Sequence, residues 1–120
     1  MKNYSVKYDA RKNRIYATFK DTLKEEEAKD YIEEMKKAAD KTKPNFTVCL
    51  DISCDPVHSK KTDEIFATGR EYLLQKKVKG TATIISKSAM AKLQAKRMLK
   101  DMNHNTFTTQ ADADKYLDSL

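Results

Sequence analysis

The chain has 120 residues, of which 39% are hydrophobic and 35% are charged, and lysine plus arginine outnumber aspartate plus glutamate by 24 to 18. This length suits a single domain over residues 1–120, and the clustering of apolar residues into periodic segments excludes a disordered chain. No apolar run approaches the roughly 20 residues of a membrane span, and the first residues lack the apolar centre of a secretory signal. We therefore expect a soluble, cytoplasmic protein.

Residue types that carry chemistry are scarce. The cysteines and histidines are Cys49, Cys54, His58 and His104. A structural zinc site needs four ligands at close paired spacing, so we expect neither a metal nor a cofactor. Gly69 and Gly80 are the only glycines, which excludes the glycine-rich phosphate loops of nucleotide enzymes. Cys54 precedes His58 by four residues, but this spacing alone is weak evidence for a nucleophilic pair, and the prediction is a protein that is not an enzyme.

The first part of the chain predicts a β-hairpin followed by a helix. Apolar and polar residues alternate over residues 4–8 and 15–19, which is typical of half-buried strands, and the polar residues 9–13 between them predict a turn. Thr22 and Glu25 then have the spacing of a capping box. The helical period that follows ends before Pro44.

The rest of the chain alternates strands with helices. Strands are expected over residues 46–52, 81–85 and 104–108. Helices are expected over residues 58–75, 88–102 and 109–120. The order β-β-α-β-α-β-α-β-α requires crossover connections, which make neighbouring strands parallel. The sequence therefore predicts an α/β fold with a mixed, mostly parallel sheet of about five strands and four helices.

Ligands of open α/β sheets bind beyond the carboxyl ends of the parallel strands. In this chain that place predicts a binding rim, which comprises Asp51, Ser53, Asp55, His58, Ser86, Lys87 and Ser88. Hydroxyls and a histidine near helix N–H groups can hold an anion or accept a phosphoryl group. A structural reading is also available, because Ser59 and Ser88 are typical N-caps and Asp55-Pro56 is typical of a turn. The two readings are compatible.

The order of elements together with Leu50-Asp51-Ile52-Ser53 resembles the STAS fold of anti-sigma-factor antagonists. The chain is similar, over nearly its whole length, to the bacterial SpoIIAA-like (STAS-like) proteins. This similarity rests on loose motifs within residues 8–16, 43–48, 91–97 and 111–117. The resemblance implies a regulatory fold that is related, at the level of architecture, to CRAL-TRIO lipid carriers.

The same resemblance implies a candidate phosphoacceptor. The antagonists of this fold are switched by phosphorylation of a serine at the start of the second helix, and the matching position here is Ser59. The surroundings depart from the family pattern, because His58 replaces an aspartate and Lys60-Lys61 replace small residues. These departures put recognition by the family's kinases in doubt.

Two functions follow as expectations. The first is a non-enzymatic regulatory or protein-interaction module with a protein partner. The second is a carrier or sensor of a small apolar, lipid-like ligand, because inward-facing methionines and tyrosines can line a pocket as well as fill a core. Nucleic acid is not expected, since no aromatic residues interleave with the lysine stripe Lys92, Lys96 and Lys100. Self-association into a homodimer through the edge of the hairpin is a further expectation.

Overall fold

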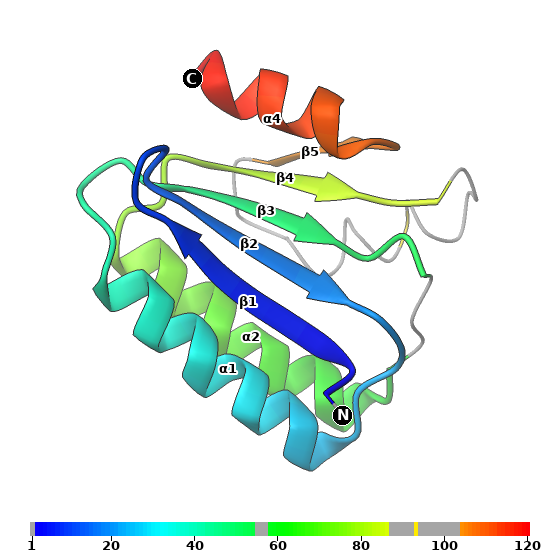
Figure 1. The fold of residues 1–120 in the computed structure, drawn as a ribbon. Coiled ribbons are helices and arrows are strands. Elements are labelled where there is room, and N and C mark those ends of the chain that lie inside the picture. The colour runs from blue at the N-terminus through cyan, green and yellow to red at the C-terminus, as the bar shows by residue number, and fades with distance from the viewer. Residues whose placement is uncertain (1, 55–57, 87–92, 94–103) are drawn as a thin grey trace.

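The protein folds around one five-stranded sheet with helices on both faces (Figure 1). The computed structural model describes residues 2–54, 58–86, 93 and 104–120. Its elements are β1 (Tyr4–Asp9), β2 (Arg14–Phe19), α1 (Glu25–Asp40), β3 (Thr47–Asp51), α2 (Lys60–Gln75), β4 (Gly80–Ile84), β5 (His104–Phe107) and α4 (Gln110–Asp118). The α/β class and the mixed sheet are thus confirmed with three described helices, whereas the helix expected over 88–102 falls almost entirely outside the described residues.

The strands lie in the sheet in the order in which they occur in the chain. β1 pairs antiparallel with β2, and β2, β3, β4 and β5 are parallel neighbours. The register places Ala17 beside Leu50 and Leu50 beside Thr83. Right-handed crossovers that advance in one direction leave their helices on one face. Accordingly α1 and α2 cover one face of the sheet, and α4 lies on the other (Figure 1).

The main core lies between the sheet and the pair α1 and α2. Ile15, Phe19 and Leu50 point to this side of the sheet and are buried against Tyr31 and Phe66 of the helices. A smaller cluster lies under α4 and consists of Cys49, Ala82, Ile84, Ala113 and Leu117. Because successive side chains of a strand point to opposite faces, β3 contributes to both clusters, as expected for a strand covered on two sides.

The start of α1 differs from the predicted capping box. The helix begins at Glu25 with Lys24 in the N-cap position, and no side chain caps it there. The prediction that Thr22 and Glu25 form the cap is therefore wrong by two residues. Tertiary contacts replace it: Leu23 is 2% exposed and fixes the entry to the helix by packing in the core, and Glu27 in the first turn accepts hydrogen bonds from Asn3 of the N-terminal segment.

Candidate functional site at the carboxyl edge of the sheet

The segments of the predicted rim leave the sheet from one edge. Asp51 lies beside Ile84 in the parallel register, and the next residue, Ile52, donates its N–H to the Ile84 carbonyl at 2.9 Å. Residues 52–54 and residues 85–86 therefore leave neighbouring strands in the same direction. The structure brings Asp51, Ser53 and Ser86 to this edge, while Asp55, Lys87 and Ser88 lie outside the described residues.

A short turn orients the first rim residues. One carboxylate oxygen of Asp51, Oδ1, accepts the Ser53 N–H at 3.0 Å and the Ser53 hydroxyl at 2.7 Å. This local pairing is typical of aspartate at the end of a strand, where its side chain replaces a backbone turn partner. Ser53 is exposed, so the edge presents a hydroxyl that the Asp51 carboxylate already holds in place.

His58 has a structural role at this edge. Its Nε2 accepts the Leu23 N–H at 3.0 Å, and its ring contacts those of Phe19 and Phe66 with centroid distances of 5.6 and 4.8 Å. Burial lowers the pKa of His58, and an accepting Nε2 requires the neutral ring with its proton on Nδ1. The side chain thus joins the segment before α1 to the start of α2, and its Nε2 is committed to that contact.

Ser59 occupies the N-cap of α2, as the structural reading predicted. Its Oγ accepts the Thr62 N–H at 3.2 Å and donates to the Thr62 hydroxyl at 3.0 Å. The residue is exposed, and Lys60 and Lys61 beside it are exposed as well. A hydroxyl at a helix N-terminus next to two cations lies where a phosphate would be stabilised electrostatically.

The structure adds a polar groove that the sequence analysis missed. It has a volume of about 310 Å³ and is lined by Ser5, Lys7, Tyr16, Ala17, Thr18, Cys49, Asp51, Ile84 and Gln110. Among the described elements, α4 packs mainly over β3, β4 and β5 and reaches β2 through Arg14 and Tyr16, and the groove lies beside it on the same face of the sheet (Figure 1). The signal was available in the sequence, because the polar residues that alternate with the apolar ones in the hairpin are the residues that line the groove. Asp51 belongs to both the groove and the rim.

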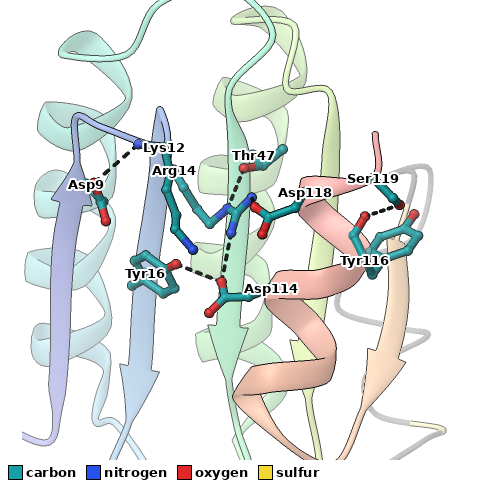
Figure 2. A network of polar contacts seen from close by, with 9 residues as sticks. All are labelled: Asp9, Lys12, Arg14, Tyr16, Thr47, Asp114, Tyr116, Asp118 and Ser119. Atoms are coloured by element: carbon teal, nitrogen blue, oxygen red, sulfur yellow. Dashed lines mark hydrogen bonds and ion pairs between the residues drawn. The ribbon is translucent and has the colours of Figure 1, made fainter.

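A buried arginine holds the wall of the groove in position (Figure 2). Arg14 of β2 donates to Asp114 and Asp118 of α4 at 2.8 Å each and to the Thr47 hydroxyl at 2.9 Å. Tyr16 donates its hydroxyl to Asp114 at 2.7 Å. The Arg14 side chain is only 3% exposed, so two ion pairs and a neutral hydroxyl compensate a cation that has left water.

Two side chains of the groove, Cys49 and Tyr16, have raised pKa values. Burial, together with the negative charge of Asp114, raises the pKa of Cys49 to about 12. Burial and the hydrogen bond to Asp114 likewise raise the pKa of Tyr16 to about 12, so both groups are protonated at neutral pH. Outside the groove, Cys54 donates its thiol to the Phe19 carbonyl at 3.2 Å, and His58 accepts from Leu23, so the structure gives no support to a Cys54–His58 pair.

No protein-family model, curated protein or solved structure matches this chain. Within the described ranges, no group of three or more His, Cys, Asp or Glu side chains could hold a metal ion. None of the helices in those ranges is long and apolar enough to cross a membrane. The class that can be assigned is therefore structural: an α/β protein with a mixed five-stranded sheet, in which the described residues form a polar groove beside the C-terminal helix.

Proposed function

We propose that the protein is a cytoplasmic, non-enzymatic regulatory or protein-interaction module of the STAS-like type, and that it binds a protein partner at the carboxyl edge of its sheet. The observation that carries this proposal is the continuity of the rim with the groove through Asp51. Ser53 on the rim and Lys7 in the groove are exposed, so hydroxyl and ammonium groups face solvent on both sides of this carboxylate. A mixed set of donors and acceptors around a concave surface suits the polar periphery of a protein interface.

Site-specific photo-crosslinking tests this proposal in the native cell. A benzophenone amino acid placed at Ser53 or Thr18 reports on the rim or the groove, and the same group at Glu33, on the exposed side of α1, is the matched control. We expect the first two positions to capture one common protein that the control does not capture. The same products from all three positions, or none from Ser53 and Thr18, would refute binding at this edge.

We further propose that phosphorylation of Ser59 regulates this edge. Ser59 is exposed at the N-terminus of α2, and Lys60 and Lys61 follow it. The helix dipole and these two cations would stabilise the negative charge of a phosphate on its Oγ. Phosphopeptide mass spectrometry on protein from its native cell should find phosphate on Ser59 under some growth conditions. A Ser59 that is unmodified under all conditions would exclude the switch and leave the residue as a helix cap only.

The alternative function, transport of an apolar ligand, has weaker support. A cavity of about 50 Å³ lies between the sheet and the helices α1 and α2, lined mainly by apolar side chains such as Phe19, Met35 and Leu73. A cavity that admits benzene has a volume of ~150 Å³, so a lipid would require these helices to move apart. Solvent extraction of the purified protein followed by mass spectrometry decides the question, because a carrier should release a lipid in stoichiometric amount.

A further inference from the structure

Seven exposed cationic side chains gather at the end of the sheet opposite the rim. This basic edge consists of Arg11, Lys12, Lys41, Lys43, Lys76, Lys77 and Lys79. The residues belong to three loops, which precede β2, β3 and β4. Because these strands are parallel neighbours, their amino ends meet at one edge, which lies on the left in Figure 1. The fold therefore collects charges that are far apart in the sequence.

Hydrogen bonds hold the three loops side by side. The Asn13 side chain accepts the Lys43 N–H at 2.9 Å and donates to the Lys43 carbonyl at 3.0 Å, which joins the first loop to the second. The Lys79 N–H donates to the Phe46 carbonyl at 2.8 Å, which joins the second loop to the third. The cations of the basic edge thus project from a backbone that is fixed in place.

Neighbouring carboxylates are engaged in local contacts. Asp9 accepts backbone N–H groups of its own turn, Asp118 pairs with Arg14, and Asp40 pairs with Lys76 at 3.1 Å. None of the salt bridges between described residues involves Arg11, Lys12, Lys41, Lys43 or Lys77. The helix dipoles account for part of the set, because Lys41 and Lys76 are the C-cap residues of α1 and α2, but they do not account for Arg11 and Lys12, which precede β2.

We propose that the basic edge docks an acidic segment of a protein partner. Two observations favour protein over nucleic acid. The Asp40 and Asp118 side chains are 53% and 57% exposed among these cations and would repel a continuous row of phosphates. Leu74, at the end of α2 beside the lysines, is 38% exposed and provides an apolar contact of the kind that protein interfaces use. This surface lies opposite the rim, so the inference goes beyond the proposed function and does not depend on it.

The test compares two variants with the same change in net charge. Lys41, Lys43 and Lys77 are replaced by glutamine in the first, and the exposed Lys20, Lys24 and Lys29, which follow β2 and lie at the start of α1, are replaced by glutamine in the second. The probe is a fluorescein-labelled peptide that repeats Glu-Glu-Leu-Asp. Its binding is measured by fluorescence anisotropy at low and at physiological salt. We expect the first variant to bind about tenfold more weakly than the wild type, because surface charge pairs contribute little singly but add over three sites.

Binding by the control variant should stay within about twofold of the wild type. Equal weakening of the two variants would show that net charge alone attracts the peptide, and no binding by the wild type would also refute the proposal. The same variants are also tested with an oligonucleotide and with vesicles of phosphatidylcholine and phosphatidylserine. If either of these binds more tightly than the peptide and shows the same dependence on the variants, the assignment to a protein partner is overturned. Urea unfolding of each variant checks that the exposed substitutions leave the fold intact.

Discussion

Among the residues that the structure describes, three that carry side chains adopt a left-handed backbone: Asn13, Asn45 and Lys77, with φ of 52°, 66° and 63°. Asparagine accepts this conformation more readily than most residues, whereas a lysine at positive φ is uncommon. Lys77 follows the C-cap of α2, and its N–H and the next one donate to the carbonyls of Leu74 and Leu73 at 3.0 and 3.2 Å. These two bonds form a Schellman motif, whose left-handed position usually holds glycine.

Replacing Lys77 by glycine should therefore stabilise the protein. We expect the free energy of unfolding to rise by about 0.5–1 kcal/mol, because relief of the left-handed strain exceeds the entropy that glycine adds to the unfolded chain. Urea denaturation measures this change. The control Lys77→Ala removes the same charge but keeps a Cβ and should leave stability unchanged, so equal effects of the two substitutions would contradict the argument.

His58 should make stability depend on pH. Burial lowers its pKa in the folded protein, so the unfolded chain binds more protons as the pH falls through the usual histidine value of about 6.5. The contribution of His58 is present above that pH and is lost as the pH falls toward the folded-state pKa, where protonation also removes the acceptor for Leu23. Urea unfolding between neutral and mildly acidic pH should show a smaller loss of stability for His58→Gln than for the wild type.

At the scale of elements, a side-chain cap stabilises the start of α4, and apolar packing and ion pairs attach this helix to the sheet. Thr109 caps the helix by accepting the Asp112 N–H at 3.2 Å, as the sequence predicted, and Leu117 is 2% exposed. The ion pairs of Arg14 with Asp114 and Asp118 fix the orientation of α4 on the sheet. They determine which face of a short helix lies on the sheet, and so where the groove wall lies.

The substitution Arg14→Met should cost about 2–3 kcal/mol of unfolding free energy, because it leaves the partly buried Asp114 without its cation. Asp118→Asn should cost clearly less, since that carboxylate is 57% exposed and water replaces its partner. Chemical denaturation of both variants measures the difference. Equal losses would mean that Asp118 carries the interaction, contrary to its exposure.

The helices α1 and α2 approach closely at Gly69. A Cβ at this position would lie 2.5 Å from the Cδ1 of Ile32, and both residues line the small cavity, into which Ile32 has room to move. For Gly69→Ala, the gain in helix propensity of about 1 kcal/mol roughly offsets this adjustment. Gly69→Val adds two more methyl groups and should destabilise the protein by about 1–3 kcal/mol in urea denaturation. A valine variant as stable as the wild type would show that the helices separate easily.

At the scale of the whole molecule, the two cysteines report on different layers. Cys54 is exposed, whereas Cys49 is buried under α4 and burial raises its pKa to about 12. A thiol reagent at neutral pH should modify Cys54 in the folded protein and both cysteines in denaturant. Arg14→Met should accelerate the modification of Cys49 because it loosens α4. Rapid labelling of Cys49 in the wild type would contradict the position of this helix.

The local pattern of the sequence determined the type of each described element. Alternation predicted the hairpin, the apolar run 46–52 predicted a strand covered on both faces, and Thr109 predicted the last cap. These features depend on neighbours within a few residues, so periodicity and capping preferences were sufficient. The predicted start of α1 was wrong because the entry to this helix depends on the contact between Leu23 and His58, which are 35 residues apart.

Only the tertiary structure decided how the elements combine. Arg14 is followed by alternating strand residues and would be expected at the surface, yet it is buried because α4, about 100 residues later, supplies two carboxylates. Among the described elements, the groove lies beside the same helix, which packs mainly over β3, β4 and β5, and Ser5, Lys7 and Thr18 of the hairpin line it. The basic edge exists because parallel neighbours bring the amino ends of three strands together. Each feature depends on contacts between distant residues, which no local sequence period encodes.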